Sequence, residues 1–134
     1  MSVNTTRFED IEAWKASRRL SRQIYTITVF AGLRRNSELK SQLRGAANSV
    51  MANIAEGFRA GSDTECARFL RIAQRSAAEV QSHLHFALDH GQITHGEFDW
   101  LDRSAEDVKK VIGGFVRNLP VPAPDSLPDM PTED

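Results

Sequence analysis

The sequence has little cysteine and no long apolar run. Its 134 residues include one cysteine, Cys66, so no disulfide can form within the chain, and this usage favours a reducing compartment. No stretch approaches the ~18 consecutive apolar residues that a transmembrane helix needs. The first residues also lack the basic and apolar regions of a signal peptide. We therefore expect a soluble cytoplasmic protein that has no membrane partner.

The alternation of apolar and polar residues that is typical of β-strands is absent as well, and so is any internal repeat. Instead, apolar residues recur at spacings of three and four, which predicts helices over about 10–30, 37–58, 62–90 and 94–119. At this length one domain is expected. Four helices joined by short loops predict an all-α fold, an antiparallel up-down-up-down four-helix bundle over residues 1–119.

Residues 120–134 differ in composition from the rest of the chain. The last 14 residues hold four of the five prolines, four acidic residues, no basic residue and no bulky aromatic residue. Such a segment cannot bury enough apolar surface to offset the entropy of ordering it. We therefore predict a disordered, acidic, proline-rich tail.

Short motifs mark the helix ends. Ser62 with Glu65, and Thr94 with Glu97, fit the capping box, in which two side chains satisfy each other's backbone N–H groups. Gly91 is suited to end the third helix. The expected core stripe of that helix comprises Cys66, Leu70, Ala73, Ala77, Val80, Leu84 and Ala87, widened by Phe69, Ile72 and Phe86.

Residues 43–59 are crowded with small residues and carry apolar residues on two adjacent stripes. Small side chains let neighbouring helices approach closely, and a wide apolar arc indicates burial on more than one side, so we predict that this is the central helix. Asn53, at a core position, is interpreted as a device that fixes helix register. Glu56 opposes the helix dipole and needs a partner such as Arg44 or Arg59. The competing interpretation, a buried general acid or base, lacks a nucleophile or second acid at a suitable spacing.

Basic residues are concentrated in the first half of the chain. The formal net charge is −1, yet residues 1–75 carry 13 Lys and Arg against 7 Asp and Glu. Of the 17 basic residues 13 are arginine, whose planar guanidinium matches phosphate geometry. This permits a polyanion partner. The candidate nucleic-acid-binding residues are Arg18, Arg19, Arg22, Arg34, Arg35, Arg44, Arg59, Arg68, Arg71 and Arg75.

The competing interpretation of these arginines is a solvated helix face with ion pairs, such as Arg68 or Arg75 with Glu65 or Glu79. The sequence has no recognition-helix motif, zinc finger or aromatic pattern of an RNA-recognition motif. Any binding is therefore expected to be weakly sequence-specific.

The remaining notable residues indicate a contact between subunits more than a catalytic site. Trp14 and Trp100 exceed what a lone bundle needs to bury, which favours oligomerisation over partial burial under a loop. The four histidines form neither the Glu-x-x-His pairs of di-iron bundles nor an HExxH motif, so we expect no metal and no other cofactor. Cys66 could be activated by a helix N-terminus, but its place in the core stripe favours an inert thiol.

Residues 44–84 carry a family resemblance. They read RGAANSVMANIAEGFRAGSDTECARFLRIAQRSAAEVQSHL. This resembles a bacterial four-helix bundle family first described as products of intervening sequences in 23S ribosomal RNA genes. The accessory protein of diversity-generating retroelements belongs to the same group. The matching residues are Arg44, Ala46, Ala47, Ser49, Asn53, Ile54, Ala55, Glu56 and Gly57, then Phe69, Leu70, Ile72, Ala73, Ser76 and Glu79.

The resemblance implies an antiparallel bundle assembled into a ring, typically a homopentamer. For the accessory protein it implies a basic ring surface that binds nucleic acid and a reverse transcriptase partner. No member is a known enzyme. The present chain departs from the pattern at Arg75, where many members carry glycine, and in its near-zero net charge.

We therefore expect a non-enzymatic, ring-forming bundle that binds RNA or DNA weakly through its arginines. The alternative is a protein–protein interaction scaffold that has no nucleic-acid role. A metal enzyme is a third class, which would require stoichiometric metal.

Overall fold

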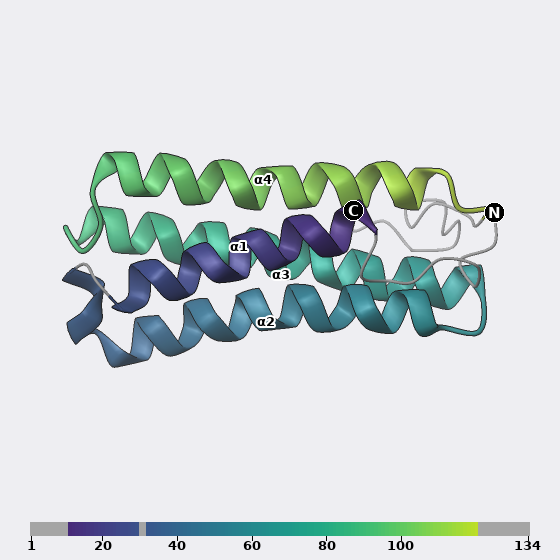
Figure 1. The fold of residues 1–134 in the computed structure, drawn as a ribbon, viewed down its shortest axis with the longest axis horizontal. Helices are drawn as coiled ribbons and strands as arrows, with labels where there is room; N and C mark the ends of the chain where they lie inside the picture. Colours follow the sequence, from purple (N-terminus) through teal and green to yellow (C-terminus); the bar gives the residue numbers. More distant parts are fainter. Residues whose placement is uncertain (1–10, 30–31, 121–134) are drawn as a thin grey trace, which may run out of the picture.

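The protein is a bundle of four long helices. The computed structural model describes residues 11–29 and 32–120, and no strand occurs among them. The helices are α1 (Glu12–Val29), α2 (Ser37–Arg59), α3 (Asp63–Asp89) and α4 (His95–Arg117), with a short 3-10 helix, η3 (Gly32–Arg35), before α2. Each helix packs against the next in the chain, and α4 packs back against α1 (Figure 1). The predicted antiparallel four-helix bundle is confirmed.

The helix ends follow the predicted motifs with one difference. At α4, Thr94 Oγ1 accepts from the backbone N–H of Glu97 at 3.0 Å and the Glu97 carboxylate accepts from the Thr94 N–H at 2.8 Å, a complete capping box. At α3, Ser62 Oγ accepts from the Glu65 N–H at 3.1 Å. The Glu65 carboxylate accepts instead from Arg68, so only half of the predicted box forms. After α3 the chain turns at Gly91, whose φ of 70° suits glycine.

Two predictions fall on residues outside the described ranges. The proposed tail of residues 121–134 stays a prediction, and so does the proposed start of the first helix at residues 9–10. Within the described residues α1 begins at Glu12, and α4 ends at Arg117, two residues before the predicted Leu119. None of the described helices is long and apolar enough to cross a membrane.

The core runs along the whole bundle, and α2, predicted to be the central helix, packs against two neighbours as each of the other helices does. Its two apolar stripes are buried almost throughout: Leu39, Leu43, Ala46, Ala47, Val50, Ile54, Gly57 and Phe58 are buried. All seven residues of the predicted α3 stripe are buried as well. Phe86, expected to widen that stripe, is 48% exposed. It lies off the stripe and stacks on His90, with the ring centroids 4.0 Å apart.

Helices α2 and α3 approach closely at Gly57. A Cβ atom placed on Gly57 would lie 3.3 Å from the Cys66 carbonyl oxygen and 3.3 Å from Leu70 Cδ2. That spacing leaves almost no room for a side chain at this position. Gly45, on the same helix, has open space around the corresponding position. The glycine that ends the Asn-Ile-Ala-Glu-Gly motif thus allows the packing of α3 on α2.

Cys66 is buried in the core at the start of α3. Burial, with a smaller contribution from the carboxylate of Asp63, raises the pKa of this thiol from 9.0 to about 11. Both causes raise the pKa, which is opposite in direction to the lowering that a helix N-terminus can produce in a thiol. The predicted inert thiol fits this environment better than an activated one.

Replacing Gly57 by valine tests the close approach of α2 and α3. We expect Gly57→Val to lower the free energy of unfolding by about 1–3 kcal/mol, because the added methyl groups overpack the contact with Leu70. Gly45→Val is the matched control, and should change it by less than about 0.5 kcal/mol. Urea denaturation followed by circular dichroism measures both. Equal effects at the two positions would contradict the packing role of Gly57.

The raised pKa of Cys66 predicts slow thiol chemistry. A thiol with a pKa of about 11 carries about 100-fold less thiolate at neutral pH than one at 9.0. A thiolate-selective disulfide reagent should therefore react at least about 100-fold more slowly with the folded protein than with the chain in urea. Similar rates in the two states would show that the thiol is neither buried nor perturbed.

Candidate nucleic-acid interface

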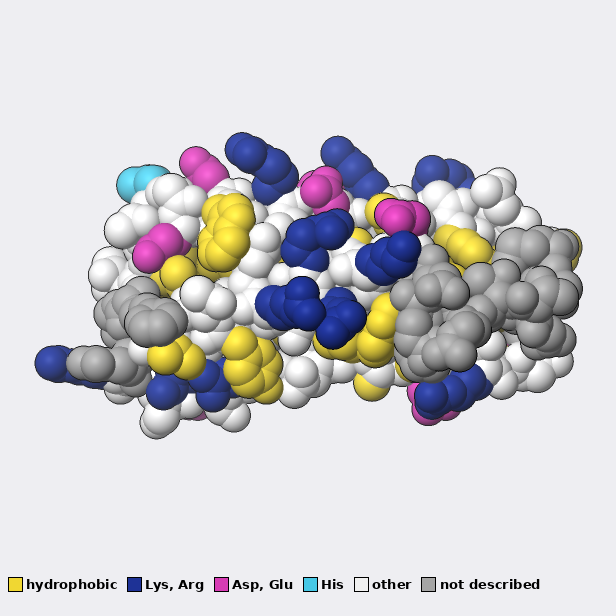
Figure 2. Space-filling model, in the orientation of Figure 1, with side chains coloured by type: hydrophobic (Ala, Val, Ile, Leu, Met, Phe, Trp, Pro, Cys, Tyr) yellow, Lys and Arg dark blue, Asp and Glu magenta, His cyan; other side chains and the backbone are white. Residues whose placement is uncertain are grey.

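A row of basic side chains follows one face of α1. Lys15, Arg18, Arg19 and Arg22 stand at i, i+3, i+4 and i+7, which places them on the same side of a helix. All four are exposed. We call these four residues the α1 row. Figure 2 shows dark blue side chains gathered over α1 in the middle of this face of the molecule.

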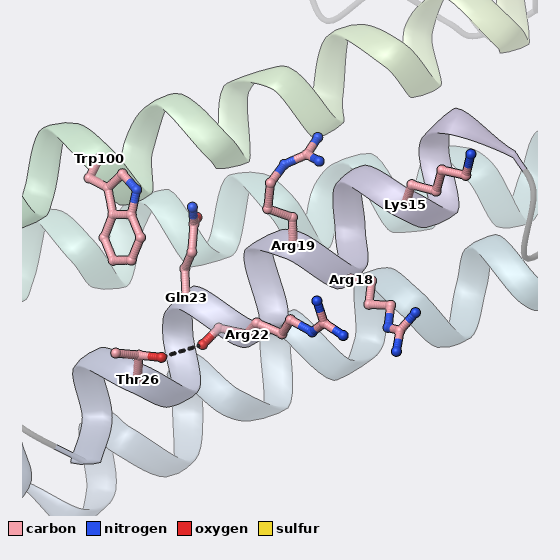
Figure 3. A pocket seen from close by; sticks show the side chains of 7 residues that line it. All are labelled: Lys15, Arg18, Arg19, Arg22, Gln23, Thr26 and Trp100. Atoms are coloured by element: carbon pink, nitrogen blue, oxygen red, sulfur yellow. Dashed lines mark hydrogen bonds between the residues drawn. The ribbon is translucent and has the colours of Figure 1, made fainter.

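The α1 row lines an open hollow of about 440 Å³ between α1 and α4. The remaining lining residues are Gln23 and Thr26 of α1 and Trp100 of α4. In Figure 3 the indole of Trp100 projects from α4 towards α1, and Gln23 lies between it and Arg19. The hollow thus joins a run of cations to an aromatic ring that is 46% exposed.

The cations of the α1 row have no partner among the described residues. Within residues 11–29 and 32–120 none of the four side chains has an ion-pair or hydrogen-bond partner. The hydrogen bond in Figure 3 runs from Thr26 Oγ1 to the backbone carbonyl of Arg22 at 3.0 Å and leaves the guanidinium free. Gln23 Oε1 is buried and has no donor among the described residues.

Arg44 differs from the α1 row because it links two helices. Its Nε donates to Thr28 Oγ1 at 2.9 Å, and its guanidinium lies 4.5 Å from the centre of the Tyr25 ring. Arg44 belongs to α2 and both contacted residues belong to α1. These contacts hold α1 against α2 and engage the charge.

Arg59 and Arg68 are ion-paired on the surface. Arg68 donates to Glu65 at 3.0 Å and 3.2 Å and stacks over Phe69, which confirms the ion pair predicted as the competing interpretation. Arg59 lies 3.9 Å from Glu56. Both Glu56 and Arg59 are well exposed, so Glu56 has one of its predicted partners and is not a buried acid or base.

The remaining candidates lie elsewhere. Arg75 is exposed and Arg71 half-buried on α3, which lies behind α1 (Figure 1). Glu79, a predicted partner of Arg75, instead approaches His83 at 3.4 Å. Arg35 is exposed in η3, and the side chain of Arg34 lies outside what the structure describes. The ten candidate arginines therefore do not form one surface.

Asn53 takes part in a small polar network between α2 and α3. Its amide donates to the Ser49 carbonyl at 2.8 Å and to Ser49 Oγ at 3.2 Å, and Ser49 Oγ bonds to Ser76 Oγ at 2.8 Å. Asn53 itself is half-buried and bonds within its own helix. Ser49, not Asn53, makes the direct bond to α3, which corrects the placing of Asn53 at a core position.

A second polar network, between α3 and α4, was not predicted from the sequence. Gln81 Nε2 donates to Asp102 at 3.2 Å and to Glu106 at 3.0 Å, while Lys109 Nζ donates to Gln81 Oε1 at 2.9 Å. The hydrogen bond from Gln81, together with the nearby charge of Lys109, lowers the pKa of Glu106. These groups satisfy one another, so we assign the network to packing. The indication available in the sequence was Gln81, a polar side chain placed where the third helix could contact the next one.

No group of three or more His, Cys, Asp or Glu side chains comes together as a metal site within the described part of the chain. His90 Nδ1 contacts the Phe86 carbonyl, and His85 packs on Phe98. His83 Nε2 is buried beside Glu79. These three histidines thus have local contacts, and the histidines of the described chain do not converge.

Comparisons with known proteins agree with this fold. The family model described as "23S rRNA-intervening sequence protein" matches residues 9–114. The chain is also similar to the crystal structure, at 1.70 Å resolution, of a protein of unknown function from the S23 ribosomal protein family of Bacteroides thetaiotaomicron. That match has a TM-score of 0.70 and 20% sequence identity, and covers 79% of this chain and 99% of the other. At that identity the likeness shows the fold alone. No curated protein matches the chain.

Proposed function

Since the chain belongs to the family of 23S rRNA-intervening sequence proteins, we propose that it is a non-enzymatic, ring-forming helical bundle that binds RNA or DNA weakly and with little sequence specificity. The observation that carries the proposal is the α1 row, in which Lys15, Arg18, Arg19 and Arg22 are exposed and unpaired within the described structure.

Unpaired cations in a row favour a polyanion. A phosphate backbone that binds them releases condensed counterions, and this release supplies most of the affinity of sequence-independent binding. Cations that already have a partner must first give it up. This favours the α1 row over Arg68 and Arg44, whose guanidinium groups are engaged. Because binding depends on these local cations, a chain whose net charge is −1 can still have a basic interface.

Assembly into a ring, with five subunits proposed, is supported by exposed apolar side chains. Two large apolar side chains, Val29 and Phe86, are 46% and 48% exposed. Contact between copies would bury such side chains. The same observation favours the second candidate function, a scaffold that holds protein partners. Recovery of protein but no nucleic acid in a pull-down after nuclease treatment would distinguish the scaffold.

The α1 row predicts a specific change in salt dependence. Arg18→Gln, Arg19→Gln and Arg22→Gln together should weaken RNA binding and reduce the slope of log K against log salt by about 2, at ~0.7 per neutralised phosphate of a single strand. Fluorescence anisotropy with labelled RNA between about 50 mM and 200 mM salt measures both quantities.

The matched control is Arg68→Gln, Arg71→Gln and Arg75→Gln on α3, which changes the net charge equally. Because Arg68 is ion-paired and Arg71 is half-buried, this triple variant should change the slope by less than half as much. A larger loss from the α3 variant would move the interface to α3. No binding by the wild type at low salt would end the nucleic-acid proposal.

Multi-angle light scattering tests the ring. We expect a mass several times the 15.0 kDa of one chain, and five times for the proposed pentamer. Phe86→Ala should shift the distribution towards smaller species if this side chain lies between subunits, while circular dichroism stays unchanged. A monomeric wild type at micromolar concentration would contradict assembly.

A further inference from the structure

We propose that Trp100 and the α1 row form a site for single-stranded nucleic acid, in which an unpaired base stacks on the indole and the adjoining phosphates lie on the arginines. This rests on the proposed nucleic-acid binding and adds to it the class of ligand. The juxtaposition in the hollow of Figure 3 carries it.

The first step is the exposed indole. Trp100 is 46% exposed and faces a hollow whose other lining side chains are all polar. An aromatic ring beside a cationic groove is the combination with which proteins bind single strands, because every base offers a π face. In a duplex those faces are stacked inside the helix, where an indole reaches them only after a base pair has opened.

The second step is the order of groups along α1. Trp100 shares the hollow with Gln23 and Thr26, while Arg22, Arg19, Arg18 and Lys15 lead away from that end (Figure 3). From Lys15 to Arg22 the helix rises about 10 Å, which is longer than the ~3.4 Å that one nucleotide occupies in a stacked strand. A base on the indole would therefore continue into a short run of phosphates along the row. The hollow, about 440 Å³, lies within the ~300–1,000 Å³ of ligand sites.

The third step separates this site from a contact between subunits. Trp100 is exposed, as a residue at an oligomer interface would be in one chain. The hollow that it lines, however, also carries four cations that have no partner in the described structure. Burying unpaired charges is costly, whereas a nucleic-acid backbone supplies the opposite charge at each step. Phe86, on α3 and stacked on His90, lacks such a row and suits a protein contact better.

Binding to single-stranded and duplex RNA tests the inference. Charge alone favours the duplex, because its phosphates are denser and its salt slope per contact is steeper. We expect instead that a short uridine homopolymer binds the wild-type protein more tightly than a duplex of equal strand length at about 50 mM salt. Trp100→Ala should weaken single-strand binding by about fivefold or more and leave duplex binding unchanged.

Two variants sharpen the result. Trp100→Phe keeps an aromatic face and should retain most of the single-strand affinity. Phe86→Ala removes an equally exposed ring on α3 and should leave the preference for single-stranded over duplex RNA unchanged, whatever it does to the oligomer. Binding of the homopolymer should also quench tryptophan emission in the wild type. The quench should disappear in Trp100→Phe, which keeps Trp14 as its tryptophan.

The outcomes separate the two proposals. If RNA binds through the α1 arginines but Trp100→Ala has no effect, or weakens both forms of RNA equally, the single-strand site is wrong and the proposed function stands. If neither form binds, both are wrong. If Trp100→Ala lowers the mass in light scattering, Trp100 lies between subunits and this inference is overturned.

Discussion

The structure depends on the close contact between α2 and α3. At Gly57 there is no room for even a methyl group without a shift of Leu70 or of the Cys66 carbonyl. Because the two helices meet this closely, Ser49 and Ser76 can bond directly across the contact. Glycine is otherwise unfavourable in a helix by about 1 kcal/mol relative to alanine. The chain keeps it here because helix packing requires it.

The packed interior determines what the arginines can do. With the core occupied by apolar and small residues, charged side chains must either connect helices at the surface or stay in water. Arg44 links two helices, because it contacts Thr28 and Tyr25 of α1. The α1 row stays in water, and its charges have no partner within the part of the chain that the structure describes. Residues of one type thus serve two purposes, and only the second is compatible with reversible binding of a polyanion.

The sequence predicts the fold well, because three-four spacing and capping residues act locally. The Thr94–Glu97 box and the α3 stripe needed no knowledge of neighbouring helices. The candidate site was harder to predict from the sequence. Arg68 and Glu65 are three residues apart, so their pairing was predictable, but the partners of Arg44 lie 16 or more residues away. The position of Trp100 opposite α1 depends on how the last helix packs.

The hollow lies between the first and the last helix, and this affects the order in which its two sides form during synthesis. Most helix contacts join neighbours in sequence, which form quickly because short loops close at low entropic cost. The contact of α1 with α4 joins the two ends of the bundle. During synthesis Lys15 to Arg22 leave the ribosome long before Trp100 does. A nascent chain therefore exposes the cations first and gains the aromatic side of the hollow only when its last helix docks.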